Sequence, residues 1–399
     1  MKIKARPEDF VVEEILGIAP KDSGPYTLLR LIKRQCNTVD AVREIAARIH
    51  RPLWTIAYGG RKDKHACATQ FITVKGPVQK GRISAFHLKE GPAASLRTRS
   101  SEFRLEPAGY LDRPMGPDLI AGNKFHIVIR NISRNEKEQA MPRLETILRR
   151  GFCNYFDDQR FGPLDPDQGF LAEKIIRKHF NGAVKFYLTR RVSEDKGEAV
   201  RRKLFFFENW GRWDQCLKEA SGRTEKEWLS HLHEHPKDFL TLLRRIPADE
   251  LAFHFASFQA FLWNEVLRRL LRRMAKPLDS YPGLSGDYLF GGEEEAEMAG
   301  AIPTVSSKMR IADPMIADTY RGLLQEKNLK TADFNLTKIR QAYFKSIERP
   351  IRVIPENMTY AFSADETAKR KQAEKLMLAF TLPRGSYATM LVKQAFAAA

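Results

Sequence analysis

The chain has 399 residues, 43% of them hydrophobic, so it can bury a sizeable core and is longer than one typical domain. Its 67 Lys and Arg against 49 Asp and Glu leave a net charge of +18, which favours nucleic acid as the partner over a merely basic surface. Four widely spaced cysteines without a C-x-x-C pair, and the lack of a long apolar stretch, argue against a disulfide framework, a zinc knuckle and a membrane span, so we expect a cytoplasmic protein.

The first 75 residues alternate between strand and helix patterns. Apolar runs within residues 10–31, broken by the turn composition KDSGP at 21–25, predict two strands in a hairpin or meander. Helical spacing of apolar residues from Val39 to Ile49 predicts an amphipathic helix. Short strands are expected at 55–58 and 70–74, so Asp63 should lie in a loop between strands.

A second strand and helix follow. Residues 125–130 alternate, with Phe125, Ile127 and Ile129 on one face, as in a half-buried strand. An apolar stripe over 141–148 predicts a helix that ends at Gly151. One α+β unit therefore extends to about residue 153.

Beyond residue 162 the pattern becomes helical and strongly charged, which predicts a second, mostly helical domain. Strand patterns return at 350–354 and 376–381, so the tail should rejoin the first domain and the middle should be an insertion. Basic clusters that would contact phosphates, provided that their helix faces touch RNA, occur at Arg190-Arg191, Arg201-Arg202-Lys203, Arg244-Arg245, Arg268-Arg269 and Arg272-Arg273.

The segment GRKDKHACATQ at 60–70 places Asp63 between two lysines after a glycine turn. Nearby cations favour the ionised form of a carboxyl group, and an ionised aspartate suits a nucleophile or a general base. A solvated turn without function is the alternative that the residue types leave open.

Other sites are not favoured. Gly59-Gly60 lacks the spacing of a phosphate-binding loop, so no nucleotide cofactor is expected. The HLHEH run at 231–235 is in a helical context, where its histidines would diverge and no metal site results. Aromatic and basic residues are interleaved at 125–130 and at 154–162, which fits either nucleobase stacking or core packing.

Five segments, in order along the chain, resemble motifs of the TruD family of tRNA pseudouridine synthases. They are KARPEDFVVE (4–13), GRKDKHACATQ (60–70), GNKFHIVIR (122–130), NYFDDQRFG (154–162) and LPRGSYAT (382–389). The resemblance runs from the N-terminus to near the C-terminus, and the segment with Asp63 is highly specific. Arg61 and Asp157 depart from the family pattern, and Asp157 replaces a glycine.

The resemblance implies an α+β fold. A pseudouridine synthase catalytic domain, with a mixed, largely antiparallel sheet and flanking helices, would cover 1–153 and 353–399. A mostly helical TRUD domain would be inserted over 154–352. The implied reaction detaches uracil from its ribose, rotates it and rejoins it through carbon 5, without cofactor or metal. The family's usual substrate is uridine 13 of the tRNA D-arm, and we expect a monomer that binds tRNA.

The matching positions imply roles for individual residues. Asp63 would be catalytic, either attacking carbon 1 of the ribose or removing the proton at carbon 2. Phe125 would lie beside the flipped uracil, and Asn123 would hold the aspartate or the uracil edge. The remaining positions that match the pocket lining are Lys4, Phe10 and Tyr387. Lys4 would also offer a cation for a phosphate or for keeping Asp63 ionised.

Two other functions are compatible with parts of the pattern. A basic RNA-binding protein without catalysis would explain the charge, although the joint presence of Asp63, Asn123 and Phe125 argues against it. A base-excising hydrolase would also use a carboxylate, but it would release free base.

Overall fold

The computed structural model describes residues 1–78, 86–87, 102–192, 195–274, 278–291, 300–370 and 372–398. The chain divides into two compact units. Unit 1 comprises 1–152 and 353–396, and unit 2 comprises 153–352 and 397–399. The chain leaves unit 1 through the short strand β9 (Phe152–Cys153) and returns through β14 (Arg352–Val353).

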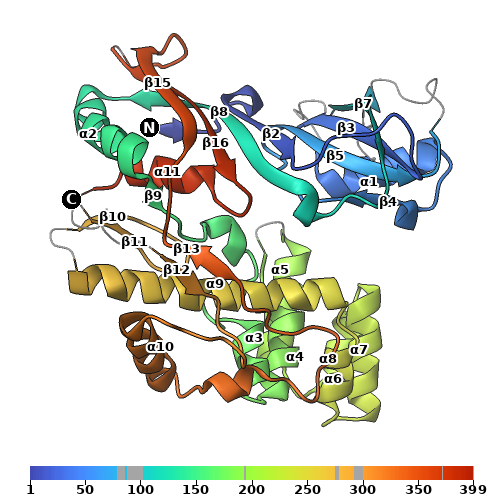
Figure 1. Ribbon diagram of the computed structural model, residues 1–399. Helices are drawn as coiled ribbons and strands as arrows, with labels where there is room; N and C mark the ends of the chain where they lie inside the picture. Colours follow the sequence, from blue (N-terminus) through green and yellow to red (C-terminus); the bar gives the residue numbers. More distant parts are fainter. Residues whose placement is uncertain are drawn as a thin grey trace. The chain divides into compact units, whose positions relative to one another are not determined.

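One large sheet forms the frame of unit 1 (Figure 1). In the described residues its strands are β1 (Lys2–Ile3), β2 (Phe10–Leu16), β3 (Tyr26–Arg34), β4 (Ile56–Tyr58), β5 (Cys67–Lys75), β6 (Phe86–His87), β7 (Glu102–Leu111), β8 (Ile120–Ile132), β15 (Glu356–Ala364) and β16 (Glu374–Pro383). Their order is β15-β16-β8-β2-β5-β3-β7-β6, with β1 beside β8 and β4 beside β5. Only the pairing of β2 with β5 is parallel among those described, so the expected mixed, largely antiparallel sheet is confirmed.

The predicted hairpin of the first two long strands is wrong. β2 and β3 are both present, but β5 lies between them. The segment from Gly17 to Pro25 connects β2 to β3 across the position of β5. Within it Lys21 forms an isolated bridge with Tyr110 of β7. Turn composition shows where a strand ends, but it does not show which strand will be its neighbour.

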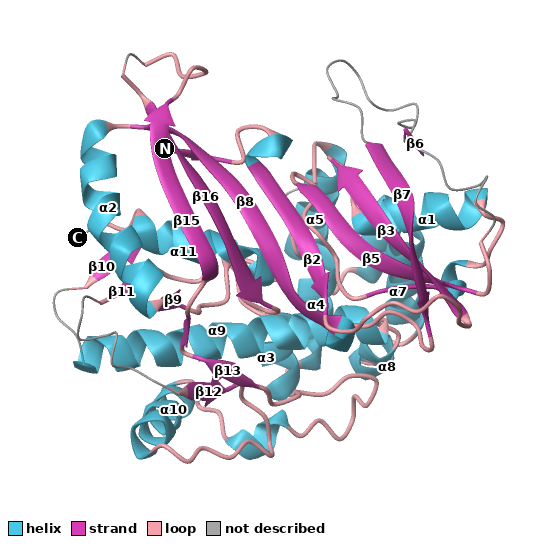
Figure 2. Cartoon of the chain, turned by 45° about the horizontal axis from the view of Figure 1, so that its top comes forward, coloured by secondary structure: helices cyan, strands magenta, loops and turns pink. Residues whose placement is uncertain are grey.

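Three helices cover one face of this sheet. They are α1 (Thr38–Arg48), α2 (Arg134–Arg150) and α11 (Ala388–Ala395). Figure 2 shows α1 behind one end of the sheet and α2 with α11 behind the other end.

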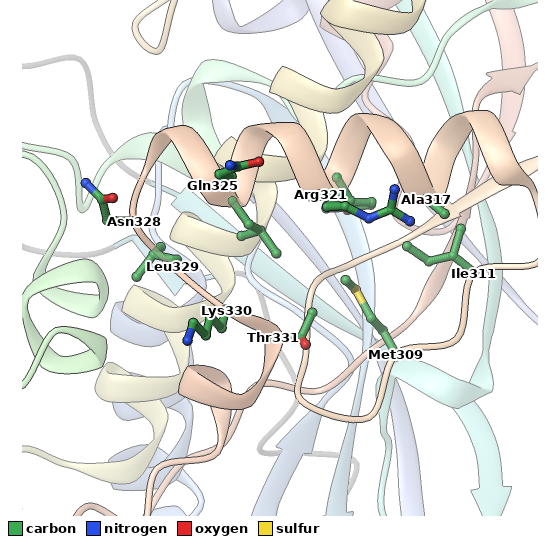
Figure 3. A pocket seen from close by; sticks show the side chains of 11 residues that line it. Met309, Ile311, Ala317, Arg321, Gln325, Asn328, Leu329, Lys330 and Thr331 are labelled. Carbon is green, nitrogen blue, oxygen red and sulfur yellow. The ribbon is translucent and has the colours of Figure 1, made fainter.

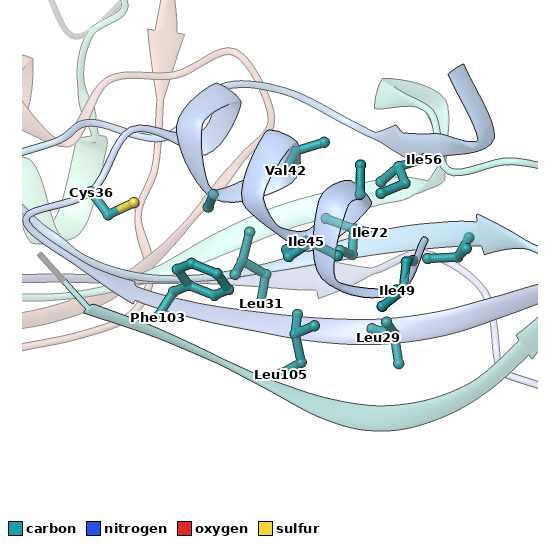
Figure 4. Packing of buried hydrophobic residues seen from close by; sticks show 13 residues of the cluster. Leu29, Leu31, Cys36, Val42, Ile45, Ile49, Ile56, Ile72, Phe103 and Leu105 are labelled. Carbon is teal, nitrogen blue, oxygen red and sulfur yellow. The ribbon is translucent and has the colours of Figure 1, made fainter. Parts of the chain in front are cut away.

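The core between α1 and the sheet is apolar and closely packed (Figure 4). Leu29 and Leu31 of β3 and Ile72 of β5 are fully buried beneath Val42 and Ile45 of α1. The helical spacing seen in the sequence thus corresponds to the buried side of an amphipathic helix. This packing fixes the first turn of α1, which lies next to the loop that contains Asp63.

Unit 2 is mostly helical, as expected. Its helices are α3 (Leu171–Ile176), α4 (Phe180–Thr189), α5 (Glu198–Glu208), α6 (Trp213–Glu219), α7 (Arg223–Glu234), α8 (Phe239–Arg244), α9 (Ala248–Met274) and α10 (Pro314–Glu326). Two small antiparallel pairs join β10 (Asp279–Tyr281) to β11 (Tyr288–Phe290) and β12 (Ala301–Pro303) to β13 (Glu348–Pro350). In the described parts of the chain, no helix has the length and apolarity needed to cross a membrane.

The basic pairs of unit 2 are largely neutralised by nearby acids. Arg268 has only 4% of its side chain exposed and pairs with Glu265 at 2.9 Å. Arg269 pairs with Glu265 and with Glu326, at 3.2 and 2.7 Å. Within this pair Arg268 is therefore poorly placed to meet a phosphate, because its guanidinium group is buried and already hydrogen bonded to backbone carbonyls of the loop at 285–287.

Gly151 ends α2 with φ +78°, a backbone conformation that favours glycine. A methyl group at this position would also overlap the carbonyl group of Val353. We predict that Gly151→Ala lowers the free energy of unfolding by about 2 kcal/mol or more. Chemical denaturation measures this change.

Gly17→Ala is the control, because the nearest atom to its added methyl group lies at an ordinary 3.5 Å. It should change the free energy of unfolding by less than about 0.5 kcal/mol. Equal effects of the two substitutions would contradict the role assigned to Gly151.

Candidate active site

Asp63 lies in the loop between β4 and β5, as the sequence predicts. Side chains from buried positions tie this loop down on both sides. The Lys62 N–H donates to the Thr38 hydroxyl at 3.0 Å, and that hydroxyl donates to Gln70 at 2.8 Å. The Gln70 amide donates to the Gly60 carbonyl at 3.2 Å. The loop is therefore held between the start of α1 and strand β5.

The register of the sheet puts the site on its helix-covered face. Gln70 is opposite Leu31, which packs under α1. Glu13 pairs with Thr69 in the parallel ladder, so Glu14 is level with Gln70, and Glu14 pairs in turn with Asn123. Side chains that are level across a sheet share a face. Asn123 and, two residues on, Phe125 thus lie on the face that α1 covers further along.

The Asp63 carboxylate is half-buried and is paired with Lys4. One of its oxygens accepts a bond from the Lys4 ammonium group, and the other accepts from the His65 N–H at 2.9 Å. Burial raises the pKa of the Asp63 carboxyl, but Lys4 and the His65 N–H lower it by more. The pKa is therefore below its usual value, and the carboxylate is ionised at neutral pH.

The expected ionisation of Asp63 is supported, but its cation is Lys4 and not a neighbouring lysine, since neither Lys62 nor Lys64 pairs with Asp63 in a described contact. Lys64 is exposed. Lys62 turns away to the Glu14 carboxylate at 3.0 Å and to the Asn123 side-chain oxygen at 2.6 Å. Adjacent residues in a loop point in different directions, and the effective cation comes from Lys4, 59 residues earlier in the sequence.

The segment with Lys4 and Phe10 is anchored on β8. Lys4 itself has φ +56°, a left-handed conformation that few residues other than glycine adopt. Arg130 of β8 binds Asp9 at 2.7 Å and Asp365 at 3.2 Å, and both carboxylates are buried. The ion pairs of Arg130 hold the segment in place, so the strained Lys4 can stay against Asp63.

Aromatic rings form an apolar wall beside this ion pair. Phe10 and Phe125 meet edge to face with their ring centres 6.1 Å apart, and Phe125 also contacts Phe380 at 5.5 Å. The Lys4 ammonium group lies 4.4 Å from the centre of the Phe10 ring. Phe125 is 7% exposed, so little of its ring is open in this state. Contacts thus link Lys4, Asp63, Phe10 and Phe125, four of the six site residues expected from the sequence. Asn123, two residues before Phe125 on β8, contacts Lys62 of the loop that contains Asp63.

Tyr387 is the remaining site residue expected from the sequence. It is half-buried and precedes the first residue of α11. The end of β16 pairs with Asn123 through Leu382, five residues before Tyr387. The fold thus brings this segment to the same end of β8 as Asn123.

Two buried charged residues of the site were not expected from the sequence. The Glu14 side chain is fully buried, and burial raises the pKa of its carboxyl despite the nearby Lys62. Lys33 is 1% exposed and donates to the Asp63 carbonyl at 2.8 Å. The sequence does hold a signal for them: each falls on the apolar side of its strand when the alternation of buried residues is continued.

The segment 154–162 in unit 2 does not offer rings for stacking. Tyr155 and Phe161 are fully buried, and Phe156 is 5% exposed beneath the Arg349 guanidinium group at 4.0 Å. Of the two explanations left open for these aromatics, core packing is therefore correct.

A hollow of about 720 Å³ in unit 2 is lined by residues of α10 and the loops around it (Figure 3). Its described lining contains no carboxylate, histidine or cysteine. It therefore lacks a carboxylate of the kind that the expected reaction requires.

The family model described as tRNA pseudouridine synthase D (TruD) matches residues 1–395. The chain belongs to the TruD family of tRNA pseudouridine synthases. The match includes both units and every segment that resembles a family motif. The enzymes of this family are isomerases, and the wholly non-catalytic and base-excising alternatives are not favoured.

Curated relatives agree with the family over the full length. The chain is 29% identical to probable tRNA pseudouridine synthase D 1 of Methanococcus maripaludis, over 99% of each chain. It is 27% identical to tRNA pseudouridine synthase D of Leptospira interrogans, over 98% of this chain and 95% of the relative. The fold matches the crystal structure of the putative TruD of Methanosarcina mazei with a TM-score of 0.71, at 22% identity over 99% and 93% of the two chains.

The Lys4–Asp63 pair predicts a change in the pH dependence of TruD activity. Lys4→Met removes the hydrogen bond and the charge of Lys4, both of which lower the pKa of Asp63, so this pKa should rise. Since we expect Asp63 to act in its ionised form, the acidic limb of the kcat profile should move to higher pH. Kinetics at saturating tRNA between pH 4 and 8 measure this shift.

Lys2→Met is the matched control, since Lys2 is exposed on β1 and has no described contact with Asp63. Its acidic limb should coincide with that of the parent. An unchanged limb in Lys4→Met would show that Lys4 does not set the ionisation of Asp63.

Proposed function

We propose that this chain converts uridine 13 in the D-arm of tRNA to pseudouridine, with Asp63 as the catalytic carboxylate. The observation that carries the proposal is the half-buried, ionised Asp63, paired with Lys4, which lies against Phe10, whose ring contacts Phe125. The reaction breaks the bond between N1 of uracil and C1′ of ribose and forms a bond from C5 to C1′. The proton lost from C5 is balanced by one gained at N1.

Asp63 serves this chemistry in either of two ways. As a nucleophile its oxygen attacks C1′ as the bond to N1 breaks, and the ester later gives way to C5. As a base it removes the C2′ proton and leaves a glycal, which later regains the proton. Both require the charged form of the carboxylate, which Lys4 favours.

The target base must leave the folded tRNA before Asp63 can reach the sugar. Unstacking costs a few kcal/mol, and contact with an aromatic ring returns about 1–3 kcal/mol per base. We assign this contact to Phe125, with Phe10 and Tyr387 completing the pocket. Since Phe125 is 7% exposed, Phe10 or Phe380 must shift to open its face as uracil enters.

The side-chain oxygen of Asn123 already accepts a hydrogen bond from Lys62. An ammonium group only donates hydrogen bonds, so the Asn123 oxygen that lies 2.6 Å from Lys62 must be the acceptor. The amide N–H2 is left to donate. We assign this donor to the O4 carbonyl oxygen of uracil. Cytosine has an amino group at the same position, which also donates and would therefore be disfavoured.

The two units divide the work in this proposal. Unit 1 is the catalytic domain and holds Lys4, Phe10, Asp63, Asn123, Phe125 and Tyr387, while unit 2 is the TRUD domain. Because one chain supplies all six residues, we propose a monomer, acting on tRNA in the cytoplasm. The net charge of +18 supplies long-range attraction to the tRNA backbone.

Asp63→Asn is the decisive substitution. It keeps the size of the side chain and removes the charge, so turnover should fall by about 10³-fold or more. Binding of tRNA should stay within about threefold, since phosphate contacts dominate affinity. Chemical mapping of pseudouridine in unmodified tRNA measures turnover, and a filter-binding titration measures affinity.

Asp22→Asn removes one charge from an exposed loop and should leave turnover unchanged. Normal isomerisation by Asp63→Asn would overturn the assignment. The mass of the product tests the reaction itself, because isomerisation leaves the tRNA mass unchanged whereas base excision lowers it. Pseudouridine at another position, with none at 13, would overturn the proposed target only.

A further inference from the structure

Lys33 is a buried cation at the end of β3. It is 1% exposed and alternates with Leu29 and Leu31, which pack under α1 (Figure 4). A buried ammonium group is costly unless hydrogen bonds replace its lost hydration. A lysine on the apolar face of a strand therefore needs a specific set of partners.

Its partners are three backbone carbonyls. The Lys33 Nζ lies 2.7 Å from the Cys36 oxygen, 3.2 Å from that of Lys62 and 2.8 Å from that of Asp63. An ammonium group has three N–H donors, so this set uses its full capacity. Two of the three acceptors are consecutive residues of the active-site loop, and the second is the carbonyl of Asp63 itself.

The electrostatic surroundings of Lys33 partly stabilise its charged form at this buried position. Burial lowers the pKa of Lys33 to about 8, while attraction to Cys36 and Asp63 opposes the effect of burial. Lys4 contacts the Asp63 carboxylate, whereas Lys33 contacts the backbone that carries it. The two lysines thus restrain Asp63 from its two ends.

We propose that Lys33 is a positioning residue for the isomerisation. By holding the carbonyls of Lys62 and Asp63, it sets the direction of the Asp63 carboxylate before tRNA binds. A displacement of about 1 Å in a catalytic group costs roughly 100-fold in rate. The proposal rests on the proposed role of Asp63, and it predicts a loss in kcat without a loss in tRNA binding.

The first test is Lys33→Met, which keeps the length of the side chain and removes its donors. At saturating tRNA, well below the melting temperature, kcat should fall roughly 100-fold. KM should stay within about twofold, because a side chain this buried does not touch tRNA. Lys33→Gln, which keeps two N–H donors, should fall between the parent and Lys33→Met.

Thr73→Val is the matched control for lost stability. Thr73 lies on the neighbouring strand β5, is fully buried and accepts a hydrogen bond from the Met115 N–H at 2.8 Å. Its loss leaves a buried polar group without a partner and lowers the melting temperature, but kcat should stay within about twofold of the parent. A parental kcat in Lys33→Met and Lys33→Gln would overturn the proposal.

Chemical rescue separates positioning from folding. Lys33→Ala removes the equivalent of propylammonium, so adding propylammonium should restore kcat at least about tenfold. Tetramethylammonium has the charge without N–H donors and should restore nothing. Equal effects of the two cations would overturn the proposal. If Asp63→Asn is inactive while Lys33→Met is fully active, this inference alone is wrong; an active Asp63→Asn overturns the proposed function instead.

Discussion

The ion pair between Lys4 and Asp63 is the interaction on which the rest of the site depends. A half-buried carboxylate tends to take up a proton, and a nearby cation prevents this. Lys4 supplies that cation from a backbone conformation that is itself unfavourable. The surrounding structure must therefore stabilise both members of the pair.

Separate groups stabilise each partner. Arg130 binds Asp9 and so holds the segment of Lys4 against β8. Thr38, Gln70 and Lys33 hold the backbone of the loop around Asp63. Each of these groups is buried or half-buried, where hydrogen bonds are costly to break. The site is thus organised before any substrate arrives, which is how enzymes reduce the cost of reaching the transition state.

The sequence predicts local features of this site better than its long-range contacts. The loop with Asp63 follows from apolar patterns on either side of it, and Phe125 follows from the alternation in β8. The pairing with Lys4 depends on where β1 joins the sheet, which no local pattern shows. The same limit explains why the predicted hairpin of β2 and β3 is wrong: β2 pairs with β5 and not with β3, the next strand in the sequence.

Clusters of basic residues in the sequence were the least informative about which side chains are exposed and available to a partner. Arg268 looks like part of a basic surface in sequence, yet Glu265 and backbone carbonyls enclose it. The edge strand β15 was not predicted, since its mostly exposed residues lack a clear alternation. Family motifs identified the six site residues together, but they did not indicate Glu14 or Lys33 as buried partners.

A titration of the Asp63 carboxyl by ¹³C NMR tests the central claim most directly. Protein labelled at the aspartate side-chain carbon is compared with Asp63→Asn, so that the difference spectrum identifies the signal of Asp63. We expect its pKa to lie below the usual aspartate value of 3.8 in the absence of tRNA. A pKa above that value would contradict the account, since Lys4 would then fail to outweigh burial.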